Sequence, residues 1–206
     1  MKQSIYRYPL YVMIHPYKGF WELKSEGAGR LHVGAALVLL AIMTNILQKQ
    51  YAGFLVNYND PRYLNSIDEL KYILLPFVLW SVSNWAVTTL LEGEGKFKEI
   101  LLATSYAMAP LVLINLPMIL ISRFMTRDET AFYYLMLSFS LLWFIYLLFV
   151  GMMTVHQYSA RKNAATMLLT VVVMGIILFL GSLVFSMIQQ LFVFVYDVYR
   201  ELIFRM

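Results

Sequence analysis

Five apolar runs, each about as long as a membrane is thick, constrain this chain more than any other feature of its sequence. A helix needs about 20 mostly apolar residues to cross roughly 30 Å of hydrocarbon. The sequence therefore predicts an all-α integral membrane protein, built as a bundle of about five transmembrane helices. The predicted spans cover residues 31–48, 72–91, 100–122, 130–155 and 164–188.

Composition supports this fold class. Of the 206 residues, 61% are apolar or aromatic and 14% are charged, against roughly 45–50% and 25% in soluble domains. A soluble fold of this length cannot bury so much apolar surface, so we expect the excess to face lipid. The chain contains no cysteine, which excludes disulfides, thiol catalysis and cysteine zinc sites.

The segment before the first span, residues 1–30, alternates tyrosine and tryptophan with lysine and arginine. Such residues prefer the headgroup layer and anionic lipid. Pro9, Pro16 and Gly19 interrupt any long helix. We expect an N-terminal arm that lies along the cytoplasmic interface.

The last apolar run is too long for one upright span, because no charge follows Asn163 until Asp197. Gln189 and Gln190 mark the expected exit from the membrane. Residues 189–206 then form an amphipathic C-terminal tail, which is either a membrane anchor or a docking helix for another protein. Its aromatic residues Phe192, Phe194 and Tyr199 are candidate interaction residues, because aromatic side chains are enriched at interfaces of both kinds.

Basic residues give the orientation. With the N-terminus inside, nine of the sixteen lysines and arginines lie on the cytoplasmic side, and the first segment usually dominates. We expect a multi-pass protein with a cytoplasmic N-terminus and an external C-terminus. The net charge of +4 is too small and too scattered for nucleic-acid binding.

Polar residues within the predicted spans are uncharged. Transport paths usually contain ionisable groups, whereas asparagine and serine commonly hydrogen-bond between helices. The third span combines small-residue pairs, Ala103/Ala107 and Ser105/Ala109, with two helix-bending prolines. Because freed carbonyls in lipid need neighbours, we expect the second and third spans to form the packed centre of the bundle.

The loop after the second span reads Glu92-Gly93-Glu94-Gly95-Lys96-Phe97. It lacks the spacing of a phosphate-binding P-loop, and its acids would repel phosphate. We interpret it as a tight turn in which the glycines supply positive φ. The candidate interaction residues in this loop are Gly93, Glu94, Gly95, Lys96 and Phe97.

The three histidines, His15, His32 and His156, are candidate metal ligands by residue type. No H-x-x-x-H or H-E-x-x-H spacing is present, so interfacial placement explains them better than a metal site. No serine–histidine–acid or paired-carboxylate arrangement is readable either. The sequence predicts no metal, no cofactor and no catalysis.

Two blocks of the sequence resemble a known family. His15-Pro16, Gly19-Phe20 and Glu22-Leu23-Lys24 before the first span are similar to the opening of bacterial Yip1-domain proteins. Trp85, the segment 93–99 and Ala109-Pro110 are similar to the most recognisable stretch of that family. The resemblance extends from about residue 13 to 190 and implies five spans with a cytosolic N-terminus.

The resemblance also implies a class of function. Eukaryotic relatives interact with small GTPases and membrane-shaping proteins, but the Asp-Leu-aromatic-Gly-Pro motif is missing here, so GTPase binding does not carry over. Some bacterial relatives occur beside genes for carbohydrate ABC importers. We therefore expect a non-enzymatic protein of the bacterial cytoplasmic membrane that binds lipids and other integral membrane proteins, possible partners being ABC permease subunits. A stand-alone small transporter or channel, and a lipid-organising or membrane-shaping protein, are the alternatives.

Overall fold

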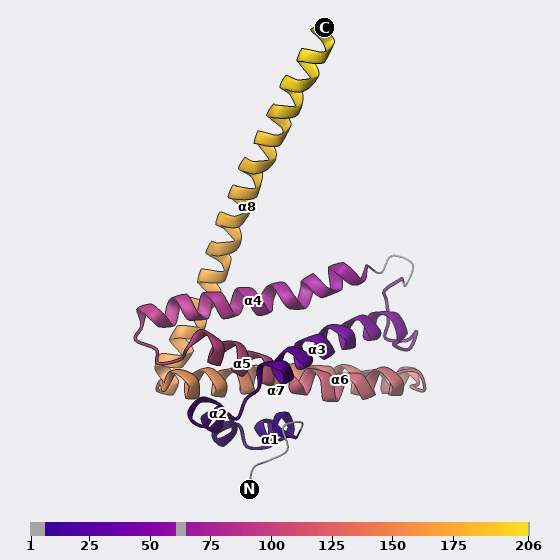
Figure 1. The fold of residues 1–206 in the computed structure, drawn as a ribbon. Coiled ribbons are helices and arrows are strands. Elements are labelled where there is room, and N and C mark those ends of the chain that lie inside the picture. Colours follow the sequence, from indigo (N-terminus) through magenta and orange to yellow (C-terminus); the bar gives the residue numbers. More distant parts are fainter. Residues whose placement is uncertain (1–6, 61–64, 206) are drawn as a thin grey trace.

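The computed structural model describes residues 7–60 and 65–205, and these residues form helices joined by short connections, without a strand among them (Figure 1). The first six residues of the arm and Met206 of the tail lie outside the described residues. The elements are α1 (Tyr8–Ile14), α2 (Pro16–Ser25), α3 (Leu31–Tyr51), α4 (Ser66–Leu90), α5 (Phe97–Ala107), α6 (Ala109–Ile121), the short 3₁₀ helix η2 (Arg127–Glu129), α7 (Thr130–His156) and α8 (Ala160–Arg205).

Five of the helical segments are long and apolar enough to cross a membrane, which confirms the predicted fold class. They are α3, α4, the pair α5–α6, η2 with α7, and α8. The second begins at Ser66, six residues before the predicted span. Asn65 starts this helix earlier because its side-chain Oδ1 accepts a hydrogen bond from the backbone N–H of Ile67 at 3.0 Å.

The third span is interrupted just before Pro110, as predicted, whereas Pro117 lies inside α6 without ending it. α5 ends at Ala107, Met108 lies between the helices, and α6 begins at Ala109. Pro110 has no N–H to continue the ladder of hydrogen bonds. This span is the most buried of the five, at 56% of its apolar window, and so forms the expected centre of the bundle. The same expectation is wrong for the second span, α4, of which only 28% is buried.

The N-terminal arm contributes to the core, which its composition did not predict. Pro9 and Pro16 each lie in the first turn of a short helix, so the arm is broken at the prolines as expected, whereas Gly19 lies inside α2 and does not interrupt it. However, Val12 and Phe20 are fully buried against α5 and α7, in the largest apolar cluster of the bundle. Trp21 remains half exposed on the outer side. One face of the arm therefore fastens it to the bundle, and the other is free for the membrane interface.

Polar side chains join the helices, as predicted. Ser140 Oγ on α7 donates to Asn115 Oδ1 on α6 at 2.7 Å. Asn84 Nδ2 on α4 donates to Thr170 Oγ1 on α8 at 3.2 Å. Each pair removes two polar groups from lipid, which is worth about 0.6–2 kcal/mol per contact.

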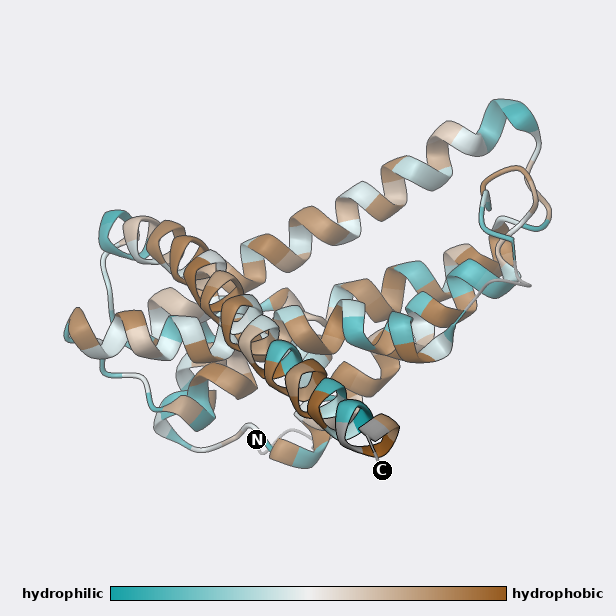
Figure 2. Ribbon diagram, turned by 90° about the horizontal axis from the view of Figure 1, so that it is seen from above, coloured by the Kyte–Doolittle hydropathy of each residue, from teal (hydrophilic) through white to brown (hydrophobic). Residues whose placement is uncertain are grey.

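The last helix, α8, is one unbroken element of 46 residues, about 69 Å long at 1.5 Å per residue. The helix does not change at Gln189, where we expected the span to end. Its first part lies against α4, and the rest projects away from the other helices (Figure 1). Only 6% of its apolar window is buried, and Figure 2 shows apolar residues along most of its projecting length.

Candidate functional site

The loop between α4 and α5 is shaped by its two ends. Helix α4 ends at Leu90, and Glu92 then adopts a left-handed conformation with φ of 58°. At the start of α5, the Glu99 carboxylate accepts a hydrogen bond from the backbone N–H of Lys96 at 3.1 Å. This satisfies one of the free donors of the first turn.

The two glycines of the loop are required for close approach, and the expectation that they supply positive φ is wrong. The left-handed residue is Glu92. A Cβ on Gly93 would lie 2.7 Å from His156 Nδ1 and 2.8 Å from the Tyr158 hydroxyl. A Cβ on Gly95 would lie 2.5 Å from Val155 Cγ1. The loop backbone therefore rests directly on the C-terminal end of α7.

His156 lies at the centre of this contact, with 2% of its surface exposed. Its Nδ1 accepts a hydrogen bond from the Gly95 N–H at 3.3 Å, and its Nε2 lies 3.1 Å from Asn84 Oδ1. Because a backbone N–H can only donate, Nδ1 carries no proton, and Nε2 donates to the amide oxygen. His156 ends α7 and is buried within the bundle, whereas His15 and His32 are exposed.

The network continues from His156 into α8, because Asn84 donates in turn to Thr170. Tyr158 adds a second link, since its hydroxyl donates to the Leu91 carbonyl at 3.0 Å and its ring stacks on His156. The loop, α4, α7 and the first part of α8 are thus joined by one set of satisfied polar groups. We call this set the loop network. It consists of the loop 92–96 and the side chains of Asn84, His156, Tyr158 and Thr170.

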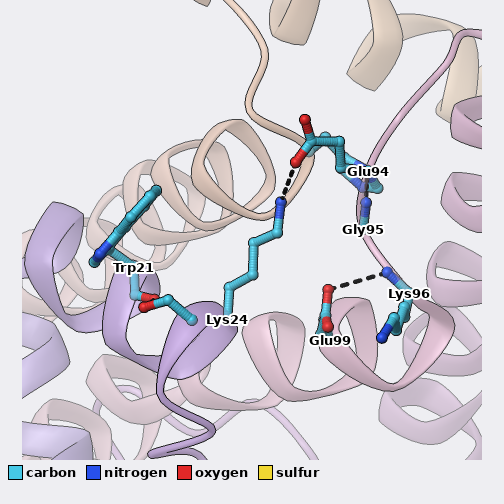
Figure 3. A network of polar contacts seen from close by, with 8 residues as sticks. Trp21, Lys24, Glu94, Gly95, Lys96 and Glu99 are labelled. Atoms are coloured by element: carbon cyan, nitrogen blue, oxygen red, sulfur yellow. Dashed lines mark hydrogen bonds and ion pairs between the residues drawn. The ribbon is translucent and has the colours of Figure 1, made fainter.

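The N-terminal arm reaches the same loop. Lys24 Nζ on α2 lies 2.8 Å from the Glu94 carboxylate (Figure 3). The lysine side chain is 15% exposed and that of the glutamate 59%, so solvent screens the pair and its contribution is at most about 1 kcal/mol. The ion pair matters mainly because it joins the arm to the loop, whose two residues are 70 positions apart in the chain.

A second polar cluster lies at the opposite ends of α3 and α4, and no sequence pattern described above indicates it. Lys49 Nζ lies 2.8 Å from the Glu69 carboxylate, which also accepts from Asn45 Nδ2 at 2.9 Å. Glu69 is 6% exposed. The signal that could have revealed it is the capping residue Asn65, since an earlier helix start places Glu69 in the first turn of α4.

The tail aromatics are not near the loop. Phe192, Phe194 and Tyr199 lie on the projecting part of α8, with about two-thirds of each side chain exposed. The beginning of α8 lies beside the loop, whereas its C-terminal end is far from the other helices (Figure 1). The two sets of predicted interaction residues therefore form two separate surfaces.

The Yip1 domain family matches residues 10–183, from α1 into the middle of α8 and including the loop network. The chain belongs to the Yip1 domain family. No curated protein and no solved structure matches the chain. Family membership and the apolar helices together fit a non-enzymatic, multi-pass membrane protein.

The ionisable side chains of the Yip1 domain are distributed as follows. Within residues 7–60 and 65–205, no three histidine, aspartate or glutamate side chains are grouped as metal ligands. The buried ionisable groups described above are paired, His156 within the loop network and Glu69 with Lys49. Large apolar side chains are exposed on several helices, above all on α8.

Proposed function

We propose that this Yip1 domain protein acts by binding other integral membrane proteins of a bacterial cytoplasmic membrane. Its proposed role is that of an accessory subunit in a transport complex, such as a carbohydrate ABC importer. The observation that carries the proposal is the C-terminal part of α8, which projects from the other helices with its aromatic residues exposed.

The chemistry of the tail supports docking over anchoring. Gln189, Gln190, Asp197 and Arg200 are costly in hydrocarbon, so residues from about 189 onward belong outside it. There the exposed rings of the tail form apolar surface in contact with water or headgroups. Exposed apolar surface of this kind marks interaction sites, and aromatic side chains dominate the energetics of interface centres.

Orientation follows from the basic residues. The arm and the loops 92–99 and 156–164 together carry nine of the sixteen lysines and arginines, so we place them in the cytoplasm. The tail is then on the external side. The arm, the loop and the start of α8 are linked through Lys24–Glu94 and His156, which gives the cytoplasmic end a fixed structure from which α8 extends.

A stand-alone transporter or channel is less well supported. Such a path would need accessible ionisable or polar groups between the helices. The buried polar groups of the loop network and of the Glu69 cluster are instead bonded to one another. A protein that only organises lipids would need no protein partner for its tail. Deletion of the tail therefore distinguishes a lipid-organising role from docking.

The test is to delete residues 190–206 and purify both proteins gently from the native host. We expect the truncated protein to insert normally and to lose the proteins that co-purify in fixed ratio. A finer pair of variants compares Phe192→Ala/Phe194→Ala/Tyr199→Ala with Val193→Ala/Val195→Ala/Val198→Ala, which changes three exposed aliphatic residues of the same tail. Only the aromatic variant should lose partners. If the truncated protein retains every partner, the tail is an anchor and docking through it is wrong.

A further inference from the structure

Helix α3 marks the two edges of the membrane in this structure. It runs from Leu31 to Tyr51, and no charged residue lies between Arg30 and Lys49. Its 21 residues extend about 31 Å at 1.5 Å per residue, which matches a hydrocarbon thickness of roughly 30 Å. Because a charged side chain is costly inside hydrocarbon, Arg30 lies at one edge of the hydrocarbon and Lys49 at the other.

The N-terminal arm lies at the same edge as Arg30, because one tyrosine of α5 contacts both. Tyr106 is fully buried, and its hydroxyl accepts a hydrogen bond from the backbone N–H of Arg30 at 3.1 Å. The Tyr8 ring packs edge-on against the Tyr106 ring, with the centroids 5.7 Å apart. The Tyr8 hydroxyl also donates to the Gly19 carbonyl at 2.6 Å, which fixes α1 on α2. Arg7, directly before Tyr8, is therefore held at the level of Arg30.

Arg7 and Arg30 differ from two other basic residues of the arm in their charge balance. Lys18 and Lys24 each lie within ion-pair distance of a glutamate, at 4.0 Å and 2.8 Å. Across residues 7–60 and 65–205, no carboxylate forms an ion pair with Arg7 or Arg30, and both arginines are exposed. Two uncompensated positive charges therefore lie at the membrane edge, next to residues that pack on Tyr106.

The exposed side of the arm has the composition of a lipid contact at this depth. Tyr17 and Trp21 are about half exposed, as is Leu31 beside Arg30. Tyrosine and tryptophan prefer the headgroup layer, and an arginine at the hydrocarbon edge extends its charged end into that layer. The planar guanidinium group carries five donors in a geometry that matches phosphate. Position, charge and donor geometry thus favour the same ligand.

We infer that Arg7 and Arg30 form a binding site for the phosphate group of an anionic phospholipid. Tyr106 is a positioning residue for this site, since it holds the backbone of Arg30 directly and that of Arg7 through Tyr8. The lipid belongs to the leaflet on the side of the arm, which is cytoplasmic in the proposed orientation. The site lies away from the tail, so it neither requires nor excludes docking of a protein there.

Native mass spectrometry of the purified protein in detergent micelles, titrated with phosphatidylglycerol, tests this site. The variant Arg7→Gln/Arg30→Gln should bind the first phosphatidylglycerol molecule roughly 25-fold more weakly than the parent, at about fivefold for each arginine. The matched control, Lys18→Gln/Lys24→Gln, removes the same charge from the same arm. It should bind phosphatidylglycerol nearly as tightly as the parent.

Three results would overturn the inference. Equal losses of affinity in the two double variants would mean that net charge alone attracts the lipid. Equal affinity of the parent for phosphatidylglycerol and phosphatidylcholine would mean that the anionic headgroup is not recognised. Displacement of phosphatidylglycerol by an excess of inorganic phosphate would assign the arginines to a soluble phosphate compound instead of a lipid.

A further variant guards against a loss of affinity that comes from misfolding. Arg7→Lys/Arg30→Lys keeps both charges but not the paired donors, and it should recover part of the affinity that the glutamine variant loses. No recovery would refute a charged contact with the headgroup. Because both arginines are exposed, circular dichroism should show the parent's helical content in every variant. None of these measurements involves a protein partner, so their failure leaves docking through the tail unaffected.

Discussion

The contact between the loop and α7 gives the sharpest test of the fold, through the substitution Gly95→Ala. The added Cβ would lie 2.5 Å from Val155 Cγ1 and 2.7 Å from His156 Cε1. Both neighbours are buried, with exposures of 0% and 2%, so neither can move aside freely. The loop must shift, and the hydrogen bond from the Gly95 N–H to His156 Nδ1 is then lost.

The magnitude follows from these two effects. Overpacking of a filled site costs about 1–3 kcal/mol, and loss of one hydrogen bond adds about 1 kcal/mol. We expect Gly95→Ala to lower the free energy of unfolding by about 2–4 kcal/mol. For a chain of this size each kcal/mol lowers Tm by roughly 2–4 °C. Thermal unfolding of the purified protein in mild detergent, followed by circular dichroism, measures the shift.

Gly175→Ala is the matched control. It makes the same chemical change in α8, where an added Cβ meets nothing within 4 Å. Because alanine favours helix over glycine by up to about 1 kcal/mol, this variant should be as stable as the parent or slightly more stable. Adding Val155→Ala to Gly95→Ala should give less than the sum of the two separate losses, since it removes the clashing methyl group. If Gly95→Ala unfolds at the parent's temperature, the close packing of the loop on α7 is refuted.

Three other predictions address the remaining parts of the molecule. Glu69→Ala should destabilise the protein by roughly 3 kcal/mol in thermal unfolding, because Lys49 and Asn45 lose a buried partner. The double variant Lys49→Met/Glu69→Leu, which leaves no unpaired charge, should be more stable than Glu69→Ala, and equal or lower stability would contradict this. Burial raises the pKa of the Tyr8 hydroxyl, and the nearby Glu22 carboxylate raises it further. The contribution of Tyr8 to stability is therefore complete below the ordinary tyrosine pKa of about 10 and declines as the pH rises above that value. Stability measured between pH 8 and 11 should therefore fall less in Tyr8→Phe than in the parent, and equal slopes would refute the assignment. In intact cells an impermeant thiol reagent should label Asn59→Cys and spare Lys96→Cys; the reverse pattern would invert the proposed orientation.

Much of the architecture could be predicted because a membrane imposes local requirements on a sequence. Hydrocarbon about 30 Å thick demands a continuous apolar run, so the existence and approximate positions of all five spans were readable. Proline removes one helical hydrogen bond, which makes the interruption before Pro110 predictable, although Pro76 and Pro117 lie inside α4 and α6 without ending them. Helix α4 begins before its apolar run, because Asn65 caps it at Ser66.

The contacts between distant parts of the chain could not be predicted in the same way. His156 has no acid or ligand within a helical turn, so nothing nearby in the sequence indicates that it binds Gly95 and Asn84, 61 and 72 residues away. The loop glycines suggested a turn conformation, but their role depends on which helix end packs against them. The buried face of the arm could not be predicted, because its aromatic and basic residues fit a helix at the membrane interface as well as they fit one packed on the bundle.

The sequence by itself determined which segments are long and apolar enough to enter the membrane and which charges stay outside it, because both depend on transfer between water and lipid along a single stretch of chain. Only the tertiary structure decided which polar groups are paired, that the arm is half buried, and that the outer half of α8 leaves the bundle. Lipid tails are as apolar as leucine, so hydropathy does not distinguish a helix side that faces lipid from one that faces another helix. That distinction depends on shape and hydrogen bonding between segments far apart in the chain.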